Sequence, residues 1–368
     1  MKIFSKSLRL IVLVACICVA SVSVHAVEQA DTASNNWIKQ LIAYNFRINE
    51  PGIKYPKFAR FLVNVYNWGD KTFNTYDTDY VVGTGKNWKA MCKSYNWFDS
   101  YSLFFSRDMR MNMMTDVYSD IGPTLCFMAV SYGYAWNANT WFGRNTGERK
   151  TFNFNFGCAL FAANLEMSSA KGGARIRRFG DYRPNGRGLN MPFNDISHDT
   201  KHLDVYYFFN NRKYSQAAAY TYSKYQKKSA GSWIVGVGIT SQMIYMDFSG
   251  LPEHMFEYLP SLYTKYNFKY VDYDLLGGYG YNVVMPHNWL YNITMLPSIG
   301  YKHSYIGTTD GRKDMLSTNL KGMMSLTYNH KALFSSLVLH YDGHLNLKPG
   351  YTFYNSMASA SLIVGMRF

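Results

Sequence analysis

Cysteine is scarce in this sequence of 368 residues, which contains only five. Beyond residue 26 only Cys92, Cys126 and Cys158 remain, an odd number without short spacing between them. Disulfide frameworks and zinc sites are built from closely spaced cysteines, often with histidines. The sequence therefore indicates neither of them.

Long apolar runs are also missing. Beyond residue 26, no stretch approaches the roughly 18 uninterrupted apolar residues that a membrane-spanning helix needs. Charged residues make up 17% of the chain and aromatic residues another 17%. A disordered chain has fewer aromatic residues, and a helical membrane protein has longer apolar runs. Aromatic rings in this number suit a surface that faces lipid in one zone and water in the next.

Residues 1–26 have the three parts of a secretory signal peptide. Lys2, Lys6 and Arg9 form a basic start, residues 10–19 an apolar centre, and residues 24–26 a Val-His-Ala exit. We therefore expect export through the inner membrane and cleavage after Ala26. The alternative is lipidation at Cys16, because residues 13–16 resemble a lipidation box, but it would leave an apolar core of only six residues, 10–15.

Acidic residues are outnumbered by basic ones, 24 against 38, which gives a formal net charge of +14. Loss of the three basic residues in the leader would leave 35 basic against 24 acidic residues, a net charge of +11. A basic protein attracts anionic partners. For an exported protein these are the phosphates of lipopolysaccharide and anionic solutes, and we expect no nucleic-acid partner.

From about residue 96 onward, apolar and polar residues alternate with the period of two that is typical of β-strands. The pattern is clear in 231–245, 271–283, 289–303, 314–328 and 358–368. A soluble β-sandwich also alternates, but its strands usually have about five or six residues, whereas many of these have about 12 or more. Long strands suit a tilted bilayer crossing. In 289–303, the apolar face carries Trp289, Tyr291, Ile293, Met295, Ile299 and Tyr301, and the polar face carries Asn292, Thr294, Ser298, Gly300 and Lys302.

We therefore predict an all-β fold for residues 88–368, a transmembrane antiparallel up-and-down β-barrel of about 12 strands. Its last strand ends at Phe368, which resembles the signal read by the outer-membrane assembly machinery. Barrels of this kind have short periplasmic turns and longer outer loops. We expect short turns at 284–288 and 328–331, and long outer loops at 248–266 and 345–355. The long linkers 138–150 and 182–199 both fall on the inner side, which puts the strand count near 109–118 in doubt.

Residues 27–87 follow a different pattern, in which apolar residues recur twice at helical spacing. We predict a periplasmic arm with two short helices. We expect their apolar residues to pack under the mouth of the barrel, in preference to forming a plug or binding a partner. The two apolar sets are Trp37, Ile38, Leu41 and Ile42, and Phe58, Phe61, Leu62 and Val65.

Several separated motifs follow one another from about residue 75 to the end of the chain. They are Asp77-Thr78-Asp79-Tyr80-Val81, Ile121-Gly122-Pro123 with Tyr132-Gly133-Tyr134, Ile176-Arg177-Arg178-Phe179-Gly180, and the block 206–232, which runs from Tyr206-Tyr207-Phe208-Phe209-Asn210 to Gln226-Lys227-Lys228-Ser229-Ala230-Gly231-Ser232. In these motifs and their order, the chain resembles a family of Bacteroidota outer-membrane proteins that is catalogued as a domain of unknown function. The resemblance implies an outer-membrane location and a barrel architecture, and it implies no activity. Relatives often carry Trp and Arg where this chain has Cys126, Phe127 and Met128.

Three pairs of charged residues are candidates for binding in the lumen or at the rim. Arg175 and Arg177 share one face of a strand, where they could line the lumen and draw in anions or clamp a lipopolysaccharide phosphate. A solvated strand end near a loop is favoured over this role. Lys213 and Lys224 flank an Ala-rich strand expected at 216–220, and they could form a basic rim. Asp272 and Asp274 face the expected interior. There, pairing with a facing cation is favoured over acid-base catalysis.

Metal-binding and catalytic signals are weak. Asp195, His198, His202 and Asp204 resemble a metal cluster, but we expect them in a loop that leads to a strand, not on a helix that would align the histidines. His303-Ser304 are neighbours, which point to opposite faces of a strand. We expect no metal, no cofactor and no enzyme activity.

The sequence thus predicts an outer-membrane barrel that passes or binds small solutes, or serves as an envelope component. Its expected partners are outer-membrane lipid, lipopolysaccharide and the assembly machinery. The alternatives are a lipid-modifying enzyme of the outer membrane, and an adhesion or structural barrel that acts through its outer loops.

Overall fold

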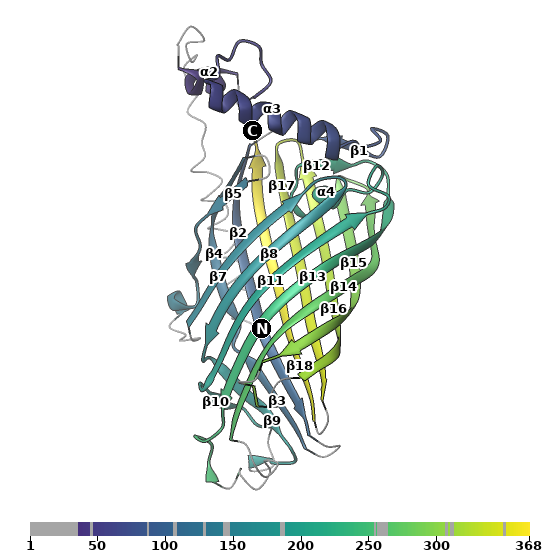
Figure 1. Cartoon of the computed structure of the whole chain (residues 1–368). Helices are drawn as coiled ribbons and strands as arrows, with labels where there is room; N and C mark the ends of the chain where they lie inside the picture. Colours follow the sequence, from purple (N-terminus) through teal and green to yellow (C-terminus); the bar gives the residue numbers. More distant parts are fainter. Residues whose placement is uncertain are drawn as a thin grey trace.

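The computed structural model describes residues 36–44, 47–86, 88–105, 109–127, 130–142, 148–184, 188–253, 255, 264–305, 308–309, 313–348 and 351–368. A helical arm lies across one end of a tall, curled antiparallel sheet (Figure 1). We name this end, which also holds the C-terminus, the inner end, and the opposite end the outer end. The predicted leader, residues 1–26, lies outside the described residues.

The arm contains the two predicted helices, α2 (Trp37–Ala43) and α3 (Lys57–Phe73). Asn36 caps α2, since its side chain accepts a hydrogen bond from the backbone N–H of Ile38 at 3.0 Å. Pro56 precedes α3, where its fixed φ favours the start of a helix. Among the residues that the structure describes, no helix is both long and apolar enough to cross a membrane.

The strands confirm the predicted alternation, and the longest ones pair in sequence order as antiparallel neighbours. The turns 286–288 and 331–332 are short, as expected, and the linker between Asp247 and Lys265 is long. The expected long loop at 345–355 is wrong, because both flanking strands continue through it. The strands are β1 (Val81–Gly83), β2 (Trp88–Phe104), β3 (Arg110–Thr115), β4 (Tyr118–Phe127), β5 (Val130–Gly133), β6 (Trp136–Asn137), β7 (Glu148–Gly157), β8 (Phe161–Lys171), β9 (Ala174–Phe179), β10 (Met191–Phe193), β11 (Ile196–Phe208), β12 (Lys224–Gln226), β13 (Ala230–Asp247), β14 (Lys265–Met285), β15 (Trp289–Ser304), β16 (Lys313–His330), β17 (Leu333–Lys348) and β18 (Tyr351–Arg367).

The sheet closes into a barrel because its first and last long strands pair, from Thr352 opposite Phe104 to Arg367 opposite Lys89. In the outer half, β2 pairs with β3, β3 pairs with β9, and β9 pairs with β10. The chain then continues from β10 into β11, which pairs with β13. These ladders, together with the chain that joins β10 to β11, complete a ring in the outer half. The fold is therefore the predicted antiparallel barrel.

The inner half of the wall contains more strands than the outer half. There β2 pairs with β4, which pairs with β5 and β6, while β8 pairs with β7. β5, β6 and β7 thus lie between β4 and β8, whereas in the outer half β3 and β9, the strands next to β4 and β8 along the chain, pair directly. These inserted strands, which we call the inserted hairpin, explain why the linkers 138–150 and 182–199 did not fit a barrel in which inner turns and outer loops alternate regularly. In the inner half, the described strands around the barrel are β2, β4, β5, β7, β8, β11 and β13 to β18, which agrees with the predicted number of about 12.

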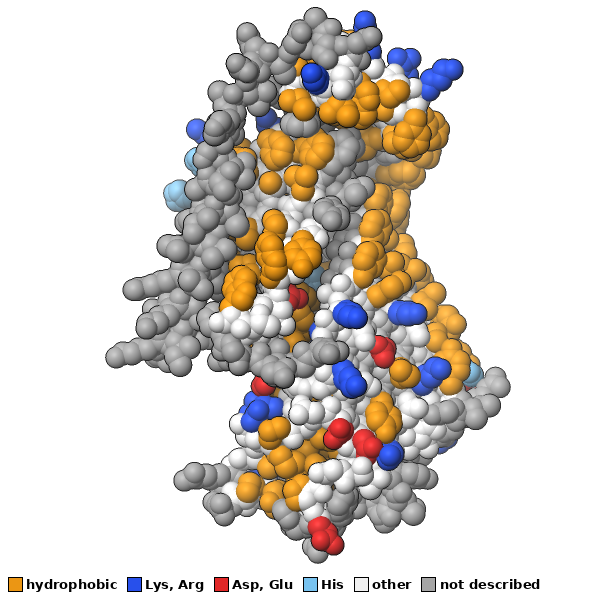
Figure 2. Space-filling view, turned by 90° about the vertical axis from the view of Figure 1, so that its left-hand side faces the viewer, with side chains coloured by type: hydrophobic (Ala, Val, Ile, Leu, Met, Phe, Trp, Pro, Cys, Tyr) orange, Lys and Arg blue, Asp and Glu red, His pale blue; other side chains and the backbone are white. Residues whose placement is uncertain are grey.

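The outward face of the barrel carries an apolar band, as the alternation predicted. On the face drawn in Figure 2, hydrophobic side chains gather over the half nearer the arm, and charged side chains over the other half. A soluble sheet would bury such side chains. The band contains Leu203, Val205, Tyr207, Trp233, Val235, Val237, Ile239, Tyr273, Leu275, Tyr279, Tyr281, Trp289, Ile293, Met295, Ile299, Tyr301, Leu320, Met324, Leu326, Leu337 and Leu339, all of them exposed.

The interior is polar only in part. Its outer end is packed with apolar and aromatic side chains, such as the stacked rings of Phe268 and Phe353, whose centroids are 4.5 Å apart. We call this packing the outer cluster. It closes the outer end of the lumen. Its members include Leu103, Met111, Met113, Ile176, Phe179, Phe193, Ile244, Met246, Phe248, Tyr266, Phe268, Tyr270 and Phe353, all of them buried.

Candidate binding site in the lumen

The inner end of the lumen is filled by the linker between β11 and β13, residues 209–229, which we call the inner segment. It contains the short helix α4 (Gln216–Tyr220) and β12. The expected Ala-rich strand at 216–220 is therefore wrong. Ser215 caps the helix by accepting from the N–H of Ala218 at 3.2 Å, and alanine is the strongest helix former. The three alanines of α4 are buried, next to Leu290 of β15.

Hydrogen bonds fix the inner segment to the barrel wall. Tyr220 donates to Asn292 Oδ1 at 2.6 Å, and the amide of Asn292 donates to the hydroxyl of Tyr214 at 3.1 Å. Asn282 donates to the carbonyl of Ser215 at 2.9 Å, and Arg367 donates to the carbonyl of Tyr222 at 2.6 Å. Burial raises the pKa of Tyr214 and Tyr220, so both phenols keep their protons at neutral pH. Hydrogen bonds to three strands, β14, β15 and β18, therefore hold the inner segment in the inner end of the lumen.

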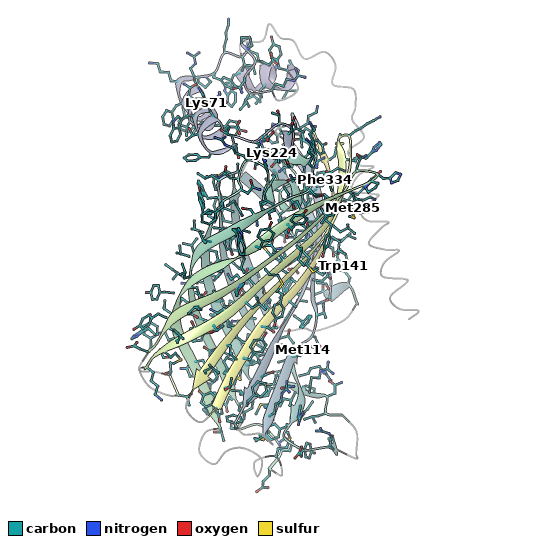
Figure 3. All side chains as sticks on the ribbon, turned by 90° about the vertical axis from the view of Figure 1, so that its right-hand side faces the viewer. Lys71, Met114, Trp141, Lys224, Met285 and Phe334 are labelled. Atoms are coloured by element: carbon teal, nitrogen blue, oxygen red, sulfur yellow. The ribbon has the colours of Figure 1, made fainter. Side chains whose placement is uncertain are left out.

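Lys213 and Lys224 contact the segment that connects α3 with β1. Their ammonium groups lie over the rings of Tyr80 and Tyr76, at 4.9 and 5.4 Å from the centroids. Burial raises the pKa of Tyr76 to about 12, so that ring stays neutral. β1 pairs with β12 beside these contacts. Figure 3 shows Lys224 at the inner end, below the helix that carries Lys71. Two separate sequence motifs, 77–81 and 206–232, therefore meet in one contact.

Arg175 and Arg177 do not line the lumen. In β9 their neighbours Ala174 and Ile176 are buried in the outer cluster, so the two arginines point to the outside of the wall. Both donate to Asn190 Oδ1, Arg175 through Nε at 2.6 Å and Arg177 through Nη1 at 2.8 Å. The expectation that they line the lumen is wrong, because the alternation in β9 puts the apolar residues inward. A contact with lipopolysaccharide phosphate stays a prediction.

Asp272 and Asp274 lie in the lumen and are buried. Lys302 Nζ is 3.3 Å from Asp272 Oδ2, and Ser317 donates to Asp272 Oδ1 at 2.6 Å. Asn319 donates to both carboxylates, at 3.2 Å to Asp272 and 2.7 Å to Asp274. Lys302 thus compensates the charge of Asp272. Asp274 accepts hydrogen bonds from the neutral side chains of Ser298 and Asn319 and forms no ion pair with any residue that the structure describes.

A second buried network, centred on Lys321 of β16, was not foreseen. Lys321 contacts Asp204 and His202 of β11, and its Nζ is 3.8 Å from Asp342 of β17. His202 Nε2 is 2.6 Å from Asp204 Oδ2, and His344 Nε2 is 3.3 Å from Asp342 Oδ1. His202 and Asp204 belong to the metal-like set Asp195, His198, His202 and Asp204, whose expected loop is instead strand β11 for all but Asp195. Within the described part of the chain, no three such side chains are placed to hold a metal ion.

A cavity of about 260 Å³ lies between this network and the inner segment. Lys321 and Asp342 line it on one side, and Tyr220 and Tyr222 of the inner segment on another. Lys93 and Glu166 also line it, and neither forms an ion pair with any residue that the structure describes. The ammonium of Lys93 lies 4.8 Å from the centroid of the Tyr95 ring. Among the residues that the structure describes, the cavity therefore presents one cation, Lys93, and one anion, Glu166, that belong to no ion pair.

A buried arginine joins the inserted hairpin to the rest of the wall. Arg149 of β7 donates through Nη1 to Asp99 Oδ2 of β2 at 3.1 Å, and both side chains are almost fully buried. Its guanidinium lies 4.4 Å from the centroid of the Trp97 ring and 5.8 Å from that of Tyr118 in β4. Residue 149 was expected in a linker, so this contact could not be read from the alternation.

These features define a β-barrel whose lumen holds the outer cluster at one end, the inner segment at the other end and a cavity between them. Residues 75–368 match the family described as Domain of unknown function (DUF4421), and the chain belongs to that family. The match begins just before the segment that pairs with β12 and leaves out α2 and α3. Comparison with curated proteins gave no match.

Several solved outer-membrane structures are similar over most of their length. The outer membrane protease OmpT from Escherichia coli is 8% identical, with 77% of this chain and 97% of that chain covered and a TM-score of 0.34. The translocator domain of the autotransporter NalP from Neisseria meningitidis is 10% identical, with 84% and 96% covered and a TM-score of 0.32. The beta domain of the Bordetella autotransporter BrkA is 9% identical, with 75% and 99% covered and a TM-score of 0.27. The comparisons therefore establish the family of the chain, and the distant structures add no function to it.

Proposed function

We propose that the protein is an outer-membrane barrel that binds a small zwitterionic solute in its central cavity and does not form an open pore. The observation that carries this proposal is the cavity in which Lys93 and Glu166 have no ion-pair partner among the described residues. Lys93 and Glu166 are half-buried, and removing a charge from water is costly unless a partner of opposite sign compensates it. A solute with one anionic and one cationic group would compensate both.

The dimensions of the apolar band support a membrane location. On β15 the exposed aromatic residues Trp289 and Tyr301 are 12 positions apart. At about 3.3 Å per residue and a tilt of about 40°, they are about 30 Å apart along the barrel axis. A bilayer has a hydrocarbon core of about 30 Å, and aromatic side chains concentrate at its two borders. The short turns, the arm and the C-terminus would then face the periplasm.

Closure at both ends favours binding over passage. A solute that crossed the lumen would have to displace the outer cluster, whose side chains are buried, and the inner segment, which is bonded to three strands. The cavity is far larger than a single water molecule needs and matches a solute of amino-acid size. The charged side chains that line the cavity can recognise a solute by ion pairing, and such binding involves no covalent chemistry.

In planar lipid bilayers we expect the purified protein to insert without stepwise conductance, because side chains fill both ends of the lumen. Insertion would be verified separately, by the change in gel mobility that a folded barrel undergoes on heating. Regular conductance steps from the folded protein would contradict the closed barrel and favour the small-solute channel.

Solute binding is expected to raise the thermal stability of the barrel in detergent when the free amino acids are tested one at a time. A ligand at about a hundredfold its dissociation constant stabilises by about 2.7 kcal/mol. The shift should disappear in Glu166→Gln and in Lys93→Met, which each remove one lining charge. Lys201→Met is the matched control, because Lys201 is the exposed neighbour of His202 on β11. Equal shifts in all variants, or none in the wild type, would contradict binding in the cavity.

A further inference from the structure

Helix α3 leaves a complete apolar face uncovered. Its residues recur at the spacing of one helix face, and they are exposed: Phe58 by 73%, Phe61 by 63%, Leu62 by 49%, Val65 by 46% and Trp68 by 63%. The expectation that this set packs under the barrel mouth is therefore wrong. Helices of soluble proteins turn such a stripe to a core, and a large exposed patch marks an interaction surface.

The exposed face is not the one that holds the arm together. Val63 and Tyr66, on another side of α3, pack on a small core formed by Leu41, Ile48 and Ile53. Asn67 donates to the side chain of Asn49 at 2.8 Å, which ties the same side of α3 to the linker between the helices. The arm thus has a core of its own, and the uncovered face is free for a separate partner.

The C-terminal end of α3 is fixed to the inner rim of the barrel. The backbone N–H groups of Ala159 and Leu160 donate to the carbonyl of Phe73, at 3.1 and 3.3 Å. The ring of Phe73 lies 5.7 Å from that of Trp68 and 5.6 Å from that of Phe161, at the start of β8. The exposed face of α3 is therefore continuous, ring by ring, with the barrel wall.

The direction of the helix suits a membrane surface. α3 lies across the inner end, roughly at right angles to the length of the barrel (Figure 1). In Figure 2 its hydrophobic side chains adjoin those of the inner half of the wall, and lysine and arginine side chains lie above them. A helix in this position lies along the bilayer surface if the apolar band is the membrane zone.

The charge of the arm is complementary to an anionic lipid surface. Residues 36–74 contain six basic side chains, Lys39, Arg47, Lys54, Lys57, Arg60 and Lys71, against two acidic ones, Glu50 and Asp70. Lys57, Arg60 and Lys71 are exposed along the polar side of α3. Amphipathic helices with Phe, Leu and Trp on one face and Lys or Arg on the other bind in the headgroup region of a bilayer.

We propose that α3 is an interfacial helix that lies in the inner leaflet of the membrane, with Phe58, Phe61, Leu62, Val65 and Trp68 among the acyl chains of anionic phospholipids. The inference rests on the proposed membrane location of the barrel. In this arrangement the arm is a second membrane contact beside the barrel wall, and it holds the inner segment and β1 close to the lipid surface.

The test is nitroxide labelling of the full-length mature protein in phosphatidylethanolamine–phosphatidylglycerol vesicles. Cys92, Cys126 and Cys158 are first replaced by alanine, and single cysteines are then introduced by Phe61→Cys, Asn64→Cys or Leu275→Cys. Asn64 is the matched control, since it is exposed on the polar side of the same helix. Leu275 reports on the apolar band of the barrel. Each label is measured for collision with oxygen, which is enriched in lipid, and with a polar nickel complex, which is enriched in water.

We expect the ratio of oxygen to nickel accessibility to be severalfold higher at position 61 than at 64, and similar to that at 275. A water-like ratio at 61 with a lipid-like ratio at 275 would overturn the interfacial helix and leave the barrel location intact. A water-like ratio at 275 would overturn the proposed membrane location itself. Protection at 61 from both reagents would show that a protein surface covers α3, which also overturns the inference.

Discussion

Replacing Lys321 by methionine is expected to lower the free energy of unfolding by about 3–5 kcal/mol, because a buried ion pair is broken and its partner charge stays behind. Lys321 contacts Asp204 and lies 3.8 Å from Asp342, and both its side chain and that of Asp204 are at most 10% exposed. Methionine keeps most of the volume, so the loss reports on charge and not on a cavity. Urea unfolding of the folded barrel in lipid vesicles, followed by tryptophan fluorescence, measures the change.

A second substitution separates the charge effect from general damage. The double variant Lys321→Met with Asp204→Asn lacks the Asp204 carboxylate, which Lys321→Met alone would leave buried without its cation. We therefore expect the double variant to lose less free energy of unfolding than the sum of the losses in the two single variants. Lys201→Met removes an exposed lysine one residue from His202 and should change stability little. Additive effects in the cycle, or an equal loss in Lys201→Met, would mean that the buried network does not stabilise the lumen.

The barrel wall could be predicted from the sequence because period-two alternation is a local property of each strand. Trp289 to Tyr301, for example, show an apolar and a polar face without any knowledge of the neighbouring strands. The two arm helices were predictable for the same reason. What covers a face is a different question, since the spacing of Phe58, Phe61 and Leu62 does not reveal whether the barrel, lipid or a partner lies against them.

The lumen could not be predicted because its contacts depend on register. Lys321 meets Asp204 across 117 residues of sequence, and this pairing exists only when β11, β13, β14, β15 and β16 are aligned as they are. Shifting one strand by one residue would turn its lumen side chains outward. α4 was missed for another reason, since five residues are too few to reveal a helical period. Its alanines were therefore read as part of the alternation around them.

Replacing Arg149 by methionine is expected to destabilise the barrel by about 3–5 kcal/mol, because Asp99 would stay buried without its cation. The variant also loses the stacking of the guanidinium on Trp97, whose centroid is 4.4 Å away. Arg149→Lys should recover only part of the loss, because an ammonium can pair with Asp99 but cannot stack as a plane. Urea unfolding of these variants and of Asp99→Asn measures the effect and the coupling between the two side chains.

Arg177→Met is the matched control for this site, since Arg177 lies on the outside of the wall, where it bonds Asn190. The reason to expect a large difference lies in the architecture of the wall. Asp99 stands in β2 at the level where β3 gives way to β4, and Arg149 stands at the start of β7, the second arm of the inserted hairpin. The ion pair therefore ties the start of β7 to β2, in addition to the ladders of the hairpin with β4 and β8. If Arg149→Met unfolded at the same urea concentration as Arg177→Met, the ladders of the hairpin with β4 and β8 would be enough to hold it.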